Sequence, residues 1–243
     1  MLEARVERAR RTTINGLPFI TGELSSQPVV LLLTGMSMVN AAMATQLALD
    51  RFPIDRIVVC GIAGGADPAL GIGDVVIPER WAECLEASIV REHPGGYGGD
   101  ILADPLGLPN FGAIFPHMVE VRSAVGAERK LWFDADPALL ARARTLDLPG
   151  LHVGGAGVSG PVFVDNAAYC GYLHQTFGAR AVDMESAAIA HVAYANGVPF
   201  IAVRGLTDRA GAEDGENTAL VHLDAVAERC AGVVAALLES LGS

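Results

Sequence analysis

The sequence lacks the features that mark several large classes of protein. None of its apolar runs approaches the length of a membrane-spanning helix, and the chain as given shows no signal peptide at its start. The four cysteines, Cys60, Cys84, Cys170 and Cys230, lie far apart, with no CxxC pair and no spacing typical of a metal site. We therefore expect no membrane partner, no metal and no cofactor.

Basic charge is also scarce. The chain carries 17 lysines and arginines against 28 aspartates and glutamates, a net charge of −11, and no basic cluster is larger than residues 8–11. Proteins that bind nucleic acid need clustered positive charge, so we expect no nucleic-acid partner. A small nucleoside remains compatible with this composition, because stacking and hydrogen bonds to its hydroxyl groups are enough to recognise it.

The pattern of apolar residues predicts an α/β fold with one domain over residues 1–243. This length is enough for one large core, which the composition predicts to be rich in Ala, Val, Ile and Leu. Apolar runs bounded by turn residues predict strands at 16–22, 27–33, 55–60, 71–78, 152–157, 181–182 and 198–203. Helical spacing predicts helices at 1–11, 39–52, 136–145, 166–177, 187–195 and 217–241.

Residues 79–127 interrupt this alternation of strands and helices. The segment is rich in Gly, Pro and aromatic residues, and Gly95–Gly99 is its most flexible point. Two interpretations stay open: a lid or oligomer contact that leaves the sheet, or an ordinary surface insertion.

The stretch from Arg180 to Asp208 organises the candidate site. Its two apolar strands enclose a helical pattern, so it is a βαβ unit, and Glu185 and Asp208 follow the ends of the two strands. In open α/β sheets, ligands bind at the carboxyl ends of the strands. The alternative interpretation is that Glu185 only caps its helix and that Asp208 only opens the next loop.

A second candidate lies in Gly61–Gly65, which we expect to form a loop after the strand 55–60. A turn of small residues at that place lets backbone N–H groups approach a ligand closely. The pattern is neither GxGxxG nor a P-loop and is a weak signal by itself, so the alternative is a simple tight turn packed against a helix.

Four motifs in this order resemble the purine nucleoside phosphorylase and methylthioadenosine/S-adenosylhomocysteine nucleosidase superfamily. The motifs are Thr34–Ala42, Gly61–Gly65 with Ile72–Val76, Val182–Ser186 and Val203–Asp208, and the resemblance covers nearly the whole chain. It implies a single three-layer α/β/α domain around a central mixed, partly barrel-like twisted sheet. Residues 38–40 and 61–68 are most similar to the plant bark storage protein branch and its bacterial relatives.

The resemblance also implies roles for individual residues in cleaving a purine N-glycosidic bond. Asp208 would protonate N7 of the leaving purine in a dry pocket, and Glu185 would accept hydrogen bonds from the ribose 2′- and 3′-hydroxyls. Met184 would pack on the sugar, Phe163 would stack on the base, and the Val164 backbone would recognise the edge of the base. The other residues expected at the substrate are Asp183, Gly35, Ile62, Ala63 and Gly64.

Hydrolysis is favoured over phosphorolysis by two positions. In the phosphorylases that the chain resembles, an arginine stands two residues before the loop glycine and a hydroxyl residue just after it. Here those positions hold Val59 and Ile62, whose side chains bind no anion. Typical nucleosidases also carry a hydroxyl where Ile62 stands. We therefore expect hydrolysis of methylthioadenosine/S-adenosylhomocysteine-type nucleosides, with phosphorolysis and non-catalytic nucleoside binding or storage as alternatives.

One departure from the family concerns the amino-terminal strand. The family begins with a strand whose following loop supplies a glutamate to position the attacking water, and this chain starts too late for it; only Glu3 is near. Either the natural chain starts further upstream or the protein has lost the group. The resemblance implies a homo-oligomer. We expect a cytoplasmic protein as the chain is given, or an exported one if a longer chain carries a signal peptide.

Overall fold

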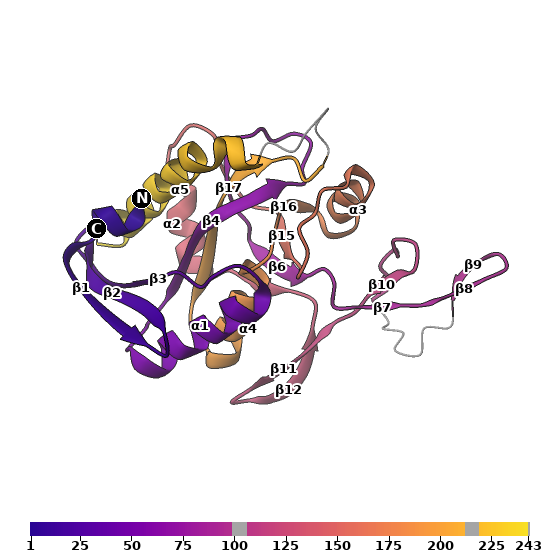
Figure 1. Cartoon of the computed structure of the whole chain (residues 1–243), viewed down its shortest axis with the longest axis horizontal. Helices are drawn as coiled ribbons and strands as arrows, with labels where there is room; N and C mark the ends of the chain where they lie inside the picture. The colour runs from indigo at the N-terminus through magenta and orange to yellow at the C-terminus, as the bar shows by residue number, and fades with distance from the viewer. Residues whose placement is uncertain (99–105, 212–218, 243) are drawn as a thin grey trace.

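The computed structural model describes residues 1–98, 106–211 and 219–242, and an eight-stranded mixed sheet is its central element (Figure 1). The strands follow the spatial order β13-β6-β15-β16-β4-β17-β5-β14. Their bounds are β4 (Ile57–Gly65), β5 (Val75–Ile77), β6 (Arg80–Glu83), β13 (Phe133–Asp134), β14 (Leu151–Val153), β15 (Ala156–Ser159), β16 (Ala179–Asp183) and β17 (Phe200–Asp208). Both parallel and antiparallel pairs occur, which confirms the mixed α/β sheet that we expected.

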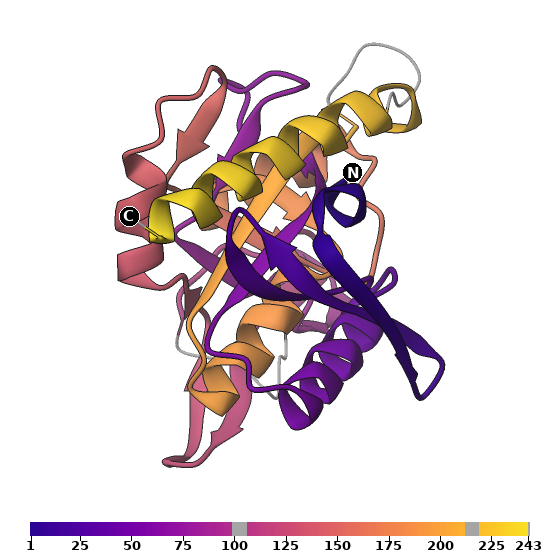
Figure 2. The same ribbon diagram turned by 90° about the vertical axis from the view of Figure 1, so that its left-hand side faces the viewer.

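Helices cover both faces of this sheet. They are α1 (Met38–Arg51), α2 (Pro137–Arg144), α3 (Ala167–Phe177), α4 (Ser186–Asn196) and α5 (Ala219–Leu241). α1 and α4 lie together on one face, whereas α5 crosses the other face (Figure 2). The predicted helices at 39–52, 136–145, 166–177, 187–195 and 217–241 are thus confirmed within one or two residues at the described ends. Among the described helices, none is long and apolar enough to cross a membrane.

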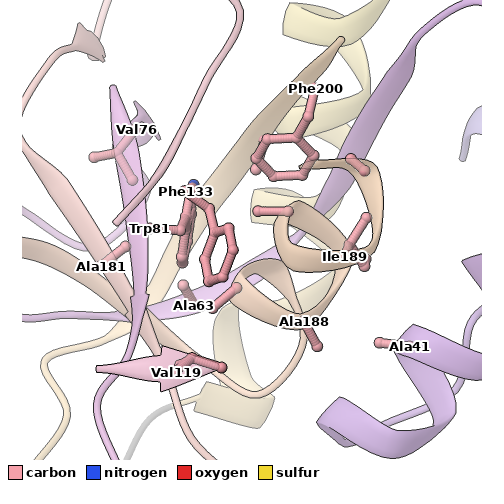
Figure 3. Packing of buried hydrophobic residues seen from close by; sticks show 14 of the residues in the cluster. Ala41, Ala63, Val76, Trp81, Val119, Phe133, Ala181, Ala188, Ile189 and Phe200 are labelled. Atoms are coloured by element: carbon pink, nitrogen blue, oxygen red, sulfur yellow. The ribbon is translucent and has the colours of Figure 1, made fainter. Parts of the chain in front are cut away.

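The core on the α4 face consists of a few large side chains and many small ones. Trp81, Phe133 and Phe200 are buried between the sheet and α4, and Ile189 packs beside them (Figure 3). Every residue of β17 is buried, as expected for a strand with helices on both faces.

The amino-terminal residues form a separate three-stranded antiparallel sheet of β1 (Glu7–Ile14), β2 (Leu17–Leu24) and β3 (Gln27–Leu32). The predicted helix over residues 1–11 is therefore wrong: only Leu2–Arg5 form a short 3₁₀ helix. The first seven residues of β1 are exposed, so pairing with β2 makes this segment a strand and no hydrophobic pattern marks it.

Residues 79–127 also depart from the prediction in part. Residues 80–83 belong to the main sheet as β6, next to β15. Much of the rest forms two-stranded ribbons that extend away from the body of the protein: β7 (Ala87–Ile89) with β10 (Ile114–Pro116), β8 (Arg91–His93) with β9 (Gly96–Gly98), and β11 (Val119–Ser123) with β12 (Gly126–Lys130) (Figure 1). Of the segment Gly95–Gly99, Gly99 lies outside the described residues.

Strand β4 has one open backbone edge. On one side it pairs with β17 along Ile57–Gly64, but on the other side β16 reaches only Gly64 and Gly65. Within the described residues, no strand pairs with the rest of that second edge, which leaves its peptide groups without the strand partner that they have in a closed sheet.

Replacing Gly157 in β15 by alanine should destabilise the fold. A Cβ there would lie 2.6 Å from the ring of Trp81, which is fully buried. Overpacking of this kind costs about 1–3 kcal/mol of the free energy of unfolding, measured by denaturant titration.

Gly171→Ala is the matched control, because a Cβ at this position in α3 meets nothing within 4 Å. It should raise the free energy of unfolding by about 0.5–1 kcal/mol. Equal effects of the two substitutions would contradict this account of the β6–β15 contact.

Candidate active site

The carboxyl ends of β16 and β17 both lie beside the end of β4. The expected parallel βαβ unit is wrong, because β16 runs antiparallel to β4 whereas β17 runs parallel to it. Gly64 of β4 pairs with Val182 of β16 and with Asp208 of β17. The expected loop at 61–65 and the expected strand end at 203 are both wrong, because β4 continues to Gly65 and β17 to Asp208. Glycine at position 64 allows β4 and β17 to pair closely here, because a Cβ on Gly64 would lie only 3.0 Å from Oδ1 of Asp208.

Asp208 is held in a fixed orientation and is only 3% exposed. Its Oδ1 accepts a hydrogen bond from the Ala210 backbone N–H at 2.7 Å, and its Oδ2 accepts one from the Thr207 hydroxyl at 3.1 Å. The same hydroxyl lies 3.5 Å from the carbonyl oxygen of Ala63. Since that hydroxyl can donate to the carbonyl or to the carboxylate, Thr207 can support Asp208 with or without a proton.

Glu185 lies at the start of α4, facing the loop that follows β3. Its Oε1 accepts the backbone N–H of Ser37 at 2.9 Å. Ser37 has φ 88°, a value that side-chain-bearing residues rarely adopt, so the loop is strained at this contact. Burial raises the pKa of Glu185, while the Ser37 N–H and the Arg204 guanidinium oppose that shift.

Arg204 connects the two carboxylates of the β16–α4 junction, and our sequence analysis gave it no role. The buried guanidinium has Nε 2.8 Å from Oδ2 of Asp183 and Nη2 3.6 Å from Oε2 of Glu185. Its Nε also donates to the Ser186 hydroxyl at 2.9 Å. An arginine inside an otherwise apolar strand is the signal that would have identified it, since such a charge needs a buried partner.

Asp183 is bonded to groups of the protein that surround the start of α4. Its Oδ1 accepts hydrogen bonds from the Ser159 hydroxyl at 2.5 Å and from the backbone N–H groups of Glu185 and Ser186 at 3.1 Å. Its buried Oδ2 accepts no hydrogen bond but forms the ion pair with Arg204, so protein groups contact both carboxylate oxygens. Asp183 thus fixes the first turn of α4, and with it the position of Glu185.

The remaining predicted residues lie around this edge at different depths. Phe163 is 61% exposed, whereas Val164 next to it is buried. Their loop is tied to the Asp208 region, because the Asn166 N–H donates to the Ala210 carbonyl at 3.1 Å. Met184 is half-buried.

The backbone positions among the predictions follow the same edge. Ala63 is buried, Ile62 and Gly64 are half-buried, and Gly35 is exposed with φ 78° in the loop that leads to Ser37. The carbonyl of Ile62 accepts a hydrogen bond from Nη1 of Arg204 at 3.3 Å. The structure therefore brings the β4, β16 and β17 residues together, with the 33–37 loop joined through Ser37.

Comparisons with known proteins identify the family of the chain. Residues 2–241 match the Phosphorylase superfamily. The chain belongs to this family. It is 33% identical over 216 residues to the 5′-methylthioadenosine/S-adenosylhomocysteine nucleosidase of Lysinibacillus sphaericus, covering 88% of this chain and 82% of that protein. The nucleosidase of the same name from Tolumonas auensis is 30% identical over 250 residues, 99% of this chain and 94% of that one.

Solved structures show the same fold. The Neisseria meningitidis nucleosidase in complex with methylthio-immucillin-A is similar with a TM-score of 0.76 and 26% identity, over 98% of this chain and 93% of that one. The Streptococcus pneumoniae nucleosidase in complex with 8-aminoadenine gives a TM-score of 0.78 at 24% identity, over 98% and 93%. The expected nucleoside phosphorylase-like fold is thereby confirmed.

Replacing Glu185 by glutamine should leave the folded protein at least as stable as the wild type at neutral pH. A carboxyl whose pKa rises on folding contributes stability below its unfolded value of about 4.3, and this is lost as the pH rises through the folded pKa. Glutamine does not ionise, so the free energy of unfolding of the variant does not fall as the pH rises through this range. Denaturant titrations at several pH values should show the two proteins converge as the pH falls below about 4.

Glu228→Gln is the control of opposite sign, because the Arg5 guanidinium lowers the pKa of the exposed Glu228. That variant should lose stability at neutral pH and match the wild type in acid. A Glu185→Gln protein that is less stable than the wild type at neutral pH would show that Glu185 is a structural carboxylate.

Proposed function

We propose that the protein is a purine nucleosidase that hydrolyses the N-glycosidic bond of methylthioadenosine/S-adenosylhomocysteine-type nucleosides. The observation that carries the proposal is the buried carboxylate of Asp208 at the end of β17, opposite the same residue of β4, Gly64, that pairs with the end of β16 just before Glu185. The relatives that cover most of the chain bear this activity in their names, which gives the substrate class.

Asp208 is the proposed proton donor to N7 of the leaving purine. The Ala210 N–H favours an unprotonated Oδ1, so Oδ2, beside the Thr207 hydroxyl, is the oxygen that carries the proton. Once Asp208 has given up this proton, Thr207 can donate to the carboxylate that remains. Protonation makes the purine a neutral leaving group, which lowers the barrier to breaking the bond.

Glu185 is the proposed partner of the ribose hydroxyls. As the bond breaks, the sugar becomes positively charged, and a carboxylate held near it stabilises that charge. Ser37 and Arg204 hold the two oxygens from the protein side, so little reorganisation is needed when the charge develops. Phe163 and the Val164 backbone contact the base, and Met184, Gly35, Ile62, Ala63 and Gly64 complete the proposed substrate contacts.

Water is the proposed acceptor of the ribosyl group. Val59 and Ile62 offer no side-chain donor to a phosphate, and Arg204 is turned toward the two carboxylates of the β16–α4 junction. A phosphorylase needs fixed cationic donors for its attacking anion. Phosphorolysis and nucleoside binding without turnover are the two alternatives.

A homo-oligomer is the proposed assembly. Met36, Val39 and Met43 form an apolar stripe on and beside α1, and they are 72%, 75% and 57% exposed. Such a stripe favours burial against another protein surface. Sedimentation should show an oligomer for the wild type and a smaller species for Val39→Glu; a monomeric wild type would contradict this.

The proposed domain is one unit over residues 1–243. Segments far apart in the chain share one core, because Leu24 near the amino terminus and Leu238 near the carboxyl terminus belong to the same buried cluster on the α5 face of the sheet.

Asp208→Asn should lower the rate of base release from methylthioadenosine by about a hundred- to ten-thousand-fold. Asparagine keeps the shape of the side chain but has no proton to give to the base. The matched control is Asp136→Asn, because Asp136 caps α2 away from the site and asparagine caps a helix equally well.

Full hydrolysis by Asp208→Asn of every nucleoside that the wild type cleaves would end the proposed mechanism. A wild-type protein that binds nucleosides and releases no base would instead support the storage or binding alternative.

A further inference from the structure

Two cysteines meet where strand β4 packs against helix α5. Cys60 and Cys230 are 170 residues apart in sequence, yet their sulfur atoms lie 3.4 Å from each other in hydrogen-bond geometry. The Cys230 sulfur also lies 3.2 Å from the carbonyl oxygen of Val203 in β17. The two thiols are therefore held together by the packing of three elements.

The two thiols differ in exposure and in acidity. Cys60 is partly exposed, whereas Cys230 is buried. The hydrogen bond from Cys60 lowers the pKa of Cys230, and the same bond, together with burial, raises the pKa of Cys60. Cys230 is thus the more acidic of the two thiols, and Cys60 is the more accessible of the two residues.

We propose that Cys60 and Cys230 form a reversible disulfide when hydrogen peroxide oxidises them, and that this bond joins β4 to α5. The sulfurs must approach from 3.4 Å to the length of an S–S bond, about 2.05 Å, by small side-chain rotations. The peroxide O–O bond breaks as the S–S bond forms. Two sulfurs are oxidised, two oxygens are reduced, and the two thiol protons leave in two molecules of water. A dithiol reductant reverses the step by thiol–disulfide exchange.

The bond would stabilise the strand that carries Gly61–Gly64 to the candidate site. β4 has one open edge, so its contact with α5 is a large part of what holds it in place. A bridge across 170 residues also restricts the unfolded chain strongly. Together these effects should raise the Tm of the oxidised protein by on the order of 10 °C.

Peptide mapping after peroxide treatment tests the proposal. The intact mass should fall by about 2 Da. Trypsin should release peptides 57–80 and 230–243 as one linked species, which dithiothreitol separates. Cys60→Ala should lose both the linked peptide and the rise in Tm, and Cys84→Ala, the control, should keep both.

A gain of oxygen mass without the linked peptide would overturn the proposal, and so would a link that involves Cys84 or Cys170. Because the mapping is done on the wild type, it decides the matter even if a cysteine variant folds poorly.

Discussion

The buried guanidinium of Arg204 is the interaction on which the candidate site depends. It lies on β17 and faces Asp183 at 2.8 Å and Glu185 at 3.6 Å, so it offsets the repulsion between two carboxylates at one helix start. A buried charge without a partner costs several kcal/mol, so Asp183, the closer of the two acids, is the partner that Arg204 requires. Gly61 makes the room: a Cβ there would lie 2.0 Å from Nη1 of Arg204. The glycine of β4, the arginine of β17 and the acids of β16–α4 are thus one packing unit.

The three acidic residues of the candidate site differ in their surroundings. Asp183 has both oxygens engaged by protein groups and sets the position of α4. Glu185 is fixed by Ser37 and Arg204 but lies at the rim, beside the strained loop. Asp208 stands apart on β17, with a backbone N–H on one oxygen and a hydroxyl on the other. Asp183 fixes the start of α4, and Glu185 and Asp208 are the two carboxylates proposed to act on a substrate.

The strand–helix–strand order of residues 180–208 was predicted correctly, because apolar runs and helical spacing are local signals, whereas the parallel pairing expected of a βαβ unit was not found. The starts of two helices were also predicted correctly, because Asp136 and Asn166 are capping residues whose side chains cap α2 and α3. Residues 61–65 were assigned to a loop because glycines mark turns. In the folded protein they remain in β4, since the side chains of Arg204 and Asp208 fill the space that a Cβ would need.

Other features depend on contacts between distant segments. Residues 7–14 have no strand pattern and become β1 only by pairing with β2. The ion pairs of Arg204 join residues about 20 positions apart across two elements, which no spacing rule reveals. Likewise, the unpaired edge of β4 became visible only once its neighbours β16 and β17 were placed. Sequence patterns identify helices and strands and their ends, whereas the strands and charged groups that pair with one another can be identified only in the folded structure.

The most direct test of the central claim is base release from methylthioadenosine with and without phosphate. The chemistry proposed for Asp208 and Glu185, with no phosphate donor at Val59 or Ile62, predicts equal rates in both conditions and free methylthioribose as the product. Release that occurs only with phosphate, and that yields a ribosyl phosphate, would contradict the account and establish a phosphorylase.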